Sequence, residues 1–415
     1  MSVYVVGVSS SVFAKHPDRT FRELAEEVVD SAFSDAQLED GLAVDHIAFG
    51  NCAMGTWGQA NIRGQVALSP LVSRGRLPAH TPIVNVEGGC ATGSLAFQSA
   101  YHCVLSGHAD LALAVGVEKT WVPHDPAQSF ALFSGGIDQL HKDEWMTFFQ
   151  EAGRSSGHGF EPDPRRIIFL DVHALMAKDH MSRYGTTSAH FAQIAAKNRA
   201  HAVGNPNAQF RVAMSPSEVL ADRPVVEPFT RAMCAPLSDG AAAVLLASSS
   251  WLDDQPESVR LRALRIDASV MVGGRYRQLD EPSVVAAAAQ KAYAAAGRQP
   301  SDIEVAEVHD ATAFCELNHY ECLGFCAKGE GAAFLQDKIP FQSGDLPVNL
   351  SGGLISKGHP LGATGLGMIQ EIAAQLRHEG GARQAPRMPT VGLVQNAGGL
   401  VGFDEALCGV TILSR

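Results

Sequence analysis

The chain has 415 residues, 46% of them hydrophobic and 18% charged, which is typical of a globular protein with room for two domains. Its formal net charge of −12 gives no general attraction for nucleic acid or for an anionic membrane surface, so we expect neither as a partner. The sequence contains no run of about 18 apolar residues, no basic leader, and eight scattered cysteines without a CxxC pair. These features predict a cytoplasmic protein with free thiols.

Short β-branched runs alternate with helical stretches along the chain. In the first part we expect strands at 3–8, 47–49, 83–86 and 111–115, and helices at 21–33 and 91–105. The same order returns later, with helices at 284–296 and 367–376 and strands at 305–308, 347–350, 390–394 and 410–413. The alternation predicts an α/β fold with a duplicated topology.

The domain organisation follows from where this rhythm breaks. Between 121 and 236 it gives way to a segment rich in His, Arg and Pro, which we interpret as a loop domain inserted in the first half; an irregular surface region is the alternative. The polar, proline-bearing stretch 251–258 predicts the boundary between the halves. We therefore expect an N-terminal half over 1–250 and a C-terminal half over 259–415.

Cys90 is the first candidate for a chemical role. It follows two glycines and precedes a helical stretch of small residues, so we expect it on a tight turn with its sulfur over the start of a helix. The helix dipole there should lower the thiol pKa from about 8.5 and favour a nucleophilic thiolate. Nearby backbone amides could stabilise an oxyanion. The alternative is a buried cysteine that packs like alanine.

A glycine-rich loop over 352–365 holds the second candidate, His359, followed by Pro360. A histidine with a pKa of about 6.5 is a suitable base for a thiol. The loop lacks the GxxxxGK[ST] order of a phosphate-binding loop and a properly placed GxGxxG, so the sequence does not predict a nucleotide site.

Four ordered motifs together resemble the thiolase superfamily, and most of all the thiolase domain of sterol-carrier-protein-type thiolases. They are Val86-Glu-Gly-Gly-Cys-Ala-Thr-Gly-Ser, His309-Asp310, Gly358-His-Pro-Leu-Gly-Ala-Thr-Gly and Gln395-Asn-Ala-Gly-Gly. The resemblance implies a thiolase fold: a duplicated, five-layered α-β-α-β-α arrangement with a loop domain that covers coenzyme A. It also implies a homodimer that pairs through the strand Ile83–Val86.

The resemblance assigns roles by position. Cys90 would be the acylated nucleophile, His359 the base that deprotonates it, and His309 a donor toward the thioester oxygen. The amides of Cys90 and Gly398 would form the oxyanion hole. The implied function is an acyl-CoA C-acyltransferase that cleaves a β-ketoacyl-CoA with free coenzyme A or runs the reverse Claisen condensation. Coenzyme A would be a substrate, and no permanently bound cofactor is expected.

One catalytic group that the family uses is missing. Thiolases take the α-proton with a second cysteine, in a C-terminal Cys-x-Gly segment or directly after the His-Asp pair, and this chain has neither; Ala311 follows the pair. Cys315 lies about one helical turn further on and is a candidate substitute. Members of the family that lack the second cysteine often act on branched, aromatic or sterol-derived acyl groups, in lipid or aromatic compound degradation. The alternative is a non-catalytic acyl-CoA-binding subunit, or an aldolase-like member, of a complex with a zinc-ribbon/OB-fold partner.

Two further patterns concern metals and coenzyme A. Cys315, His319, Cys322 and Cys326 form one stripe of a helix, for which we expect a structural role and no metal. Basic residues of the inserted segment could meet the coenzyme A phosphates, and the candidates are Arg165, Arg166, Arg183 and Lys197.

Overall fold

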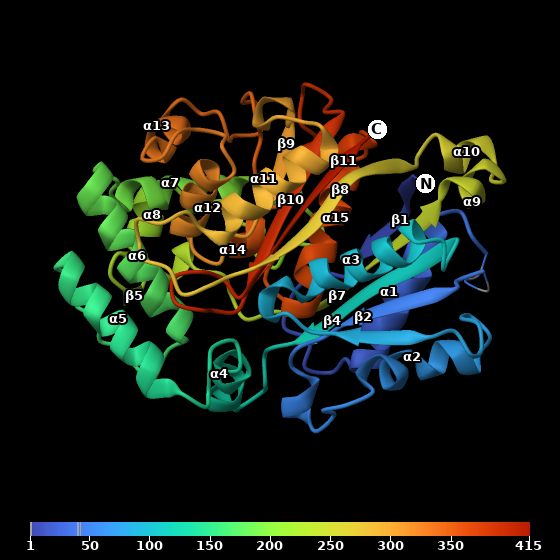
Figure 1. Cartoon of the computed structure of the whole chain (residues 1–415), viewed down its shortest axis with the longest axis horizontal. Helices are drawn as coiled ribbons and strands as arrows, with labels where there is room; N and C mark the ends of the chain where they lie inside the picture. Colours follow the sequence, from blue (N-terminus) through green and yellow to red (C-terminus); the bar gives the residue numbers. More distant parts are fainter. Residues whose placement is uncertain (1, 40, 42) are drawn as a thin grey trace.

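The computed structural model describes residues 2–39, 41 and 43–415, and its centre is a mixed β-sheet (Figure 1). The strands follow the order β3-β2-β4-β7-β1-β8-β11-β10-β9 across this sheet. Their bounds are β1 Val3–Ser10, β2 His46–Gly50, β3 Ile83–Val86, β4 Leu111–Lys119, β7 Asp239–Ser248, β8 Leu264–Gly273, β9 Val305–Val308, β10 Val391–Gly398 and β11 Leu407–Ser414.

The sheet consists of two halves of one topology. β3, β2 and β4 run parallel and β4 continues antiparallel through β7 to β1; in the second half β9 and β10 run parallel and β10 continues antiparallel through β11 to β8. Within the sheet, the two half-sheets are joined by the pairing of Tyr4 and Val5 of β1 with Arg265 and Leu264 of β8. This confirms the duplication that the sequence predicted.

Helices complete the layers on both sides of the two half-sheets. The helices are α1 Phe21–Asp35, α2 Arg63–Ser73, α3 Thr92–Leu105, α4 Pro126–Ser134, α5 Lys142–Ser156, α6 Ile168–Tyr184, α7 Ser188–Ala202, α8 Pro216–Leu220, α9 Ser249–Asp253, α10 Glu257–Arg260, α11 Val284–Ala296, α12 Ala313–Cys322, α13 Gly331–Gln336, α14 Gly353–Lys357 and α15 Leu361–Leu376. None of the helices in the described part of the chain is long and apolar enough to cross a bilayer.

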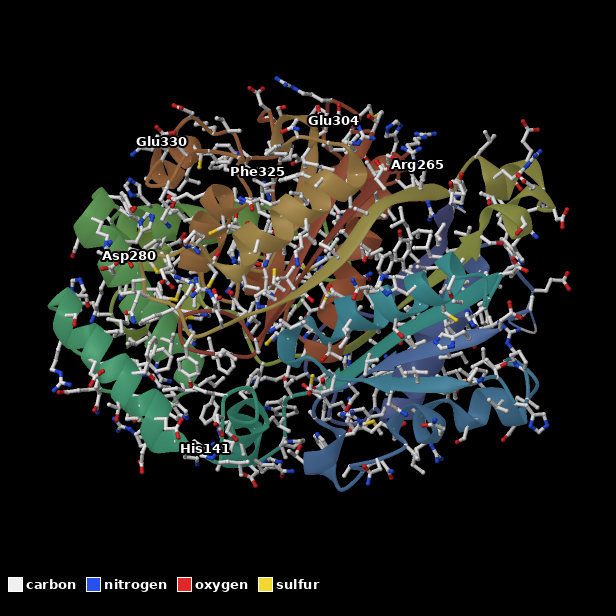
Figure 2. All side chains as sticks on the ribbon, viewed as in Figure 1. His141, Arg265, Asp280, Glu304, Phe325 and Glu330 are labelled. Atoms are coloured by element: carbon white, nitrogen blue, oxygen red, sulfur yellow. The ribbon has the colours of Figure 1, made fainter. Side chains whose placement is uncertain are left out.

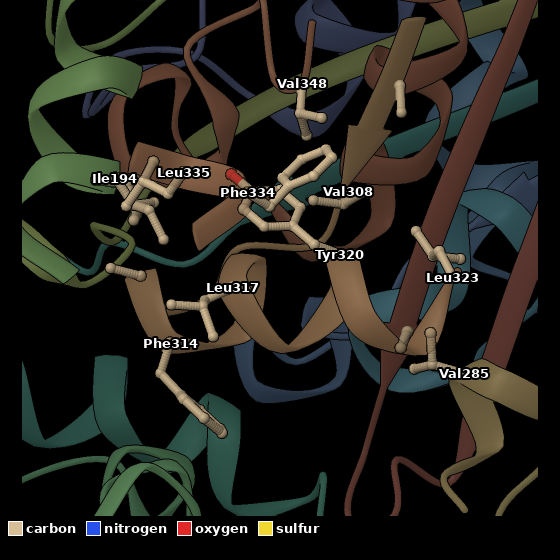
Figure 3. Packing of buried hydrophobic residues seen from close by; sticks show 14 of the residues in the cluster. Ile194, Val285, Val308, Phe314, Leu317, Tyr320, Leu323, Phe334, Leu335 and Val348 are labelled. Carbon is tan, nitrogen blue, oxygen red and sulfur yellow. The ribbon is translucent and has the colours of Figure 1, made fainter. Parts of the chain in front are cut away.

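The middle layer is formed by α3 and α15, which share one apolar core with strands of both halves. The outer face of the first half-sheet is covered by α1 and α2. That of the second is covered by α11 and α12, where Tyr320 lies beside Val308 (Figure 3). Side chains fill the spaces between these layers, whereas charged residues such as Glu304 point outward (Figure 2). The arrangement is the five-layered α-β-α-β-α fold that the sequence predicted.

Two predicted elements differ from the structure. The helix predicted over 367–376 begins earlier, at Leu361, because Gly362 and Gly365 allow close packing: a Cβ on Gly365 would lie 2.4 Å from Ser94 Oγ. The strand predicted over 347–350 is reduced to one parallel bridge between Val348 and Ala306, since Asn349 adopts a φ of +57° and turns the chain away.

The segment over 121–236 forms a largely helical lobe, from α4 to α8, with a hairpin of β5 Pro224–Val226 and β6 Phe229–Thr230 (Figure 1). Ile137, Trp145 and Phe149 of this lobe pack against Leu400 and Phe403 of the C-terminal half. The lobe therefore covers the region where β10 ends. The boundary that we propose at 251–258 falls in the connection between β7 and β8, which holds α9 and α10.

Candidate active site

Cys90 lies on the turn between β3 and α3, as the sequence predicted. Gly89 has a φ of +57°, a left-handed conformation that suits glycine. The Thr92 hydroxyl accepts a hydrogen bond from the Gly88 amide and donates one to the Gly89 carbonyl, at 2.9 and 2.7 Å. These bonds hold the turn in place.

The end of β10 lies directly against this turn. A Cβ added to Gly398 would lie 2.3 Å from the Cys90 nitrogen and 2.4 Å from the Ala91 nitrogen, distances that no side chain can occupy. Gly89 is packed closely against Gly399 in the same way, since a Cβ added to Gly89 would lie 2.8 Å from the Gly399 nitrogen. The two peptide segments predicted to form the oxyanion hole are therefore in contact, and only glycine permits it.

Three side chains from distant segments meet beside this contact. One nitrogen or sulfur atom from each of Cys90, His309 and His359 lies within 4.8 Å of the other two. The two imidazole rings stand edge to face, with centroids 5.0 Å apart. His309 follows β9, and His359 precedes α15. The fold thus assembles the three residues that the sequence singled out for catalysis.

The hydrogen bonds around His359 define its tautomer. Nδ1 lies 2.8 Å from the Thr364 hydroxyl, and that hydroxyl donates its own hydrogen to the Pro360 carbonyl at 3.0 Å. The hydroxyl must therefore accept from Nδ1–H, which leaves Nε2 with a free lone pair. Nε2 is buried and has no hydrogen-bond partner in the described part of the chain. His359 is thus prepared to accept a proton.

His309 has the opposite tautomer. Its Nδ1 lies 2.8 Å from the Asn396 side-chain amide nitrogen, a donor, so Nδ1 accepts and Nε2 carries the hydrogen. The Ser94 hydroxyl donates to the Asn396 oxygen at 3.0 Å and fixes the orientation of this amide. His309 therefore presents an N–H where His359 presents a lone pair. Sequence reasoning missed Asn396 and Thr364, although both belong to motifs that it quoted.

The predicted thiolate at Cys90 is wrong for the free protein. Burial, followed by the carboxyl group of Glu118, raises the pKa of Cys90 to about 12, although a hydrogen bond from its own amide acts in the opposite direction. Burial also lowers the pKa of His359 to about 3. Desolvation outweighs the helix dipole here. At neutral pH the pair is therefore a thiol and a neutral imidazole.

The pKa of Glu118 is itself raised to about 7 by burial, even though the amides of Cys52, Ala53 and Gly362 donate to its carboxylate. This buried carboxyl group ties β4 to the start of α15 and to the turn after β2. Its charge acts on the pKa of Cys90, and the sequence analysis did not single it out.

The reactive groups line a cavity of about 80 Å³. Apolar walls come from Phe133, Phe169, Leu170 and Leu400, and further polar groups from His173, Cys315 and Glu405. Phe133 and Ile167 also line a larger cavity of about 610 Å³, at which Lys142, Arg165 and Arg166 are found. The cavity that holds Cys90 and the cavity with the basic residues of the lobe therefore share two apolar lining residues.

Two residues predicted for coenzyme A line neither of these cavities. Lys197 is wrong as a phosphate ligand, because its side chain is fully buried, 2.7 Å from Glu316 Oε1, and donates to the Val348 carbonyl. Arg183 pairs with Asp179 at 2.8 Å and lines a separate cavity of about 280 Å³ that shares no residue with the Cys90 cavity.

Metal binding has little support in the described residues. The helical stripe of Cys315, His319, Cys322 and Cys326 does not bring three ligand atoms together; within residues 2–39, 41 and 43–415 only Cys90, His309 and His359 do so. In that trio the His309 tautomer leaves no free lone pair, so two ligands remain. A thiol, a base and a donor fit acyl transfer better than they fit an ion.

The arrangement agrees with comparisons to known proteins. Residues 3–227 match the family described as Thiolase, N-terminal domain, and residues 275–413 match Thiolase C-terminal domain-like. The chain is similar to sterol carrier protein 2 of Bos taurus, with 35% identity over 92% of this chain and 68% of that one. It is 34% identical to acetyl-CoA acetyltransferase of Methanothermobacter thermautotrophicus over 96% and 97% of the two chains. Benzoylsuccinyl-CoA thiolase subunit BbsB of Thauera aromatica is 30% identical over 96% and 94%.

Solved structures agree in fold. The Ltp2-ChsH2(DUF35) aldolase superimposes with a TM-score of 0.75 at 24% identity, and human mitochondrial 3-ketoacyl-CoA thiolase in complex with CoA with 0.67 at 17%; each comparison covers 100% of this chain and 98% of the other. Identities this low carry the fold alone. The two family matches and the relatives that align over nearly their full length show that the chain belongs to the thiolase family and is an acyl-CoA acyltransferase of that type.

Proposed function

We propose that this acyltransferase cleaves a β-ketoacyl-CoA with free coenzyme A, or condenses two acyl-CoA molecules in reverse, through an acyl intermediate on Cys90. The observation that carries the proposal is the opposed chemistry of the two histidines. His359 offers an unpartnered lone pair to the Cys90 region, and His309 offers an N–H on the other side.

In the cleavage direction Cys90 attacks the β-keto carbonyl, and its proton passes to Nε2 of His359. The developing oxyanion lies against the contact between the Cys90 turn and Gly398. As the carbon–carbon bond breaks, its electron pair becomes the enolate of the departing acyl-CoA, whose thioester oxygen accepts a hydrogen bond from Nε2–H of His309. Free coenzyme A then takes the acyl group from Cys90, and His359 returns the proton.

The cavity walls support an apolar acyl group as substrate. Two aromatic rings, Phe133 and Phe169, and two leucines face Cys90, and a similar protein is a benzoylsuccinyl-CoA thiolase subunit. We therefore favour branched, aromatic or sterol-derived β-ketoacyl groups. Lys142, Arg165 and Arg166 are our candidates for the coenzyme A phosphates, in place of Lys197. Coenzyme A would be a substrate, with no permanent cofactor.

A non-catalytic acyl-CoA-binding role is the alternative class. Such a subunit needs no thiol beside an unpartnered imidazole, so the convergence of Cys90 and His359 favours the enzyme.

We propose a cytoplasmic homodimer through β3, since this strand forms one edge of the sheet and Val84 on it is 41% exposed. A zinc-ribbon/OB-fold partner remains part of the proposal for the aldolase-like alternative.

The test is the intact mass of the protein after mixing with a panel of acyl-CoA and β-ketoacyl-CoA thioesters. We expect an adduct of acyl mass that is absent from Cys90→Ala and disappears when free coenzyme A is added. Cys322→Ala, which changes a cysteine outside the 80 Å³ cavity, serves as the matched control and should acylate normally. An unchanged mass with every thioester, despite coenzyme A binding, would favour the non-catalytic alternative.

A further inference from the structure

A second thiol–imidazole pair faces the cavity that holds Cys90. The Cys315 sulfur lies 3.5 Å from Nδ1 of His173 and 3.2 Å from the Thr312 hydroxyl. Cys315 comes from α12 and His173 from α6 of the lobe, 142 positions apart in the sequence. Both line the 80 Å³ cavity, together with the partly buried side chain of Glu405.

The local structure explains why this thiol reaches the cavity. Ala311, directly after the His309-Asp310 pair, also lines the cavity but offers only a methyl group. Cys315 lies in the first turn of α12, where its amide donates to the Thr312 carbonyl at 3.0 Å. Side chains of a helix lean toward its N-terminus, which here points at the cavity. The thiol on the first turn therefore reaches the space that Ala311 leaves open.

We propose that Cys315 is the group that exchanges the α-proton of the acyl-CoA, and that His173 is the residue that positions it. The inference rests on the proposed function and supplies its missing acid/base. The carboxyl group of Glu405, which lines the same cavity, acts electrostatically on both Cys315 and His173.

The proton balance closes around one turnover. During cleavage the enolate carbon takes the hydrogen of the Cys315 thiol, which leaves a thiolate hydrogen-bonded to the His173 N–H. When free coenzyme A attacks the acyl group on Cys90, its thiol proton passes to the Cys315 thiolate. Cys90 meanwhile recovers its proton from His359. Each sulfur begins and ends the cycle protonated, and the net reaction is one β-ketoacyl-CoA and one coenzyme A to two acyl-CoA molecules.

The surroundings of Cys315 keep its thiol protonated before the reaction, as a proton donor requires. Burial raises the pKa of Cys315 to about 12 and lowers the pKa of His173 to about 4. At neutral pH the thiol is therefore intact and the imidazole is neutral. A neutral imidazole can accept the thiol hydrogen or, as the other tautomer, donate to the thiolate. Cys315 can thus give up and recover a proton without a permanent charge in the cavity.

The test separates acylation from α-proton exchange. Acylation of Cys90 by a saturated acyl-CoA is followed by intact mass, and exchange is followed as deuterium uptake at the α-carbon of the same acyl-CoA in D2O. In Cys315→Ala and Cys315→Ser we expect acylation within about tenfold of the unchanged protein, because a coenzyme A thiolate can leave without a proton. Exchange should fall by about 10²- to 10⁴-fold. Cys322→Ala should keep both.

For His173, the measurement must distinguish a positioning role from a purely structural one. In His173→Gln the thiolate loses the imidazole N–H, so the basic limb of the exchange profile should shift to higher pH; a purely structural effect would lower the rate equally at every pH. Exchange at the normal rate in Cys315→Ala would overturn the inference, as would a protein that acylates without exchange. Failure of every thioester to acylate Cys90 would instead overturn the proposed function. Acylation also reports a folded site in each variant.

Discussion

The Thr364 hydroxyl lies 2.8 Å from Nδ1 of His359 and gives its own hydrogen to the Pro360 carbonyl, so it can only accept from the imidazole. A threonine one turn into α15 therefore decides which nitrogen of His359 is the base. The contact depends on the early start of this helix, which brings Thr364 back over the His-Pro pair.

Replacing this acceptor should slow acyl transfer. Thr364→Val keeps the shape of the side chain but removes the oxygen, so the imidazole loses the bond that holds Nε2 free. We expect Cys90 acylation to slow by about 10- to 100-fold, in single-turnover mass measurements, with acyl-CoA binding unchanged. Thr364→Ser keeps the hydroxyl and should stay within about threefold. Equal rates in the valine and serine variants would contradict this role.

The contact between Gly398 and the Cys90 turn should tolerate no side chain. Gly398→Ala places a Cβ where only 2.3 Å separates it from the Cys90 nitrogen, so β10 and the turn must move apart. Losing an oxyanion donor of this kind costs about 10²- to 10³-fold in turnover. Gly55→Ala is the matched control, because the nearest atom to its added Cβ is 3.8 Å away. Normal thiolysis by the Gly398 variant would show that the contact is not part of the oxyanion site.

The reactivity of Cys90 should rise steadily with pH. A thiol whose pKa is raised to about 12 stays protonated below that value, so the thiolate fraction grows about tenfold per pH unit from pH 7 to 10. Burial lowers the pKa of His359 to about 3, so no imidazolium is present at neutral pH to hold a thiolate. Iodoacetamide alkylation, located on Cys90 by peptide mass, measures this. A rate already constant from pH 6 would reveal a Cys90–His359 ion pair instead.

Lys197 should matter for stability and not for coenzyme A. Lys197→Ala leaves Glu316 buried without its cation, and breaking a buried pair in this way costs about 3–5 kcal/mol of unfolding free energy. Arg183→Ala removes a pair whose arginine is 43% exposed, and we expect a loss below about 1 kcal/mol. Urea unfolding followed by circular dichroism compares them. Equal stability of the two variants, with weaker coenzyme A binding only in the lysine variant, would restore Lys197 as a phosphate ligand.

The sequence by itself determined the α/β class and the duplicated topology, and it singled out Cys90, His309 and His359, which the fold brings together. Periodicity carries the first two, because strand and helix spacing are local properties. The glycine turn before Cys90 and the loop around His359 are also local, and their short motifs are enough to indicate the chemistry. His309 was singled out by the resemblance to the thiolase superfamily alone.

Only the tertiary structure decided how these residues behave. The tautomer of His309 depends on Asn396, 87 positions away, and His173 meets Cys315 only through the packing of the lobe on α12. The raised pKa of Cys90 also depends on the tertiary structure. So does the buried ion pair of Lys197, because the sequence around this lysine gives no sign that its side chain is buried. Burial and long-range neighbours set pKa values and tautomers, and neither is written in the spacing of residues along one segment.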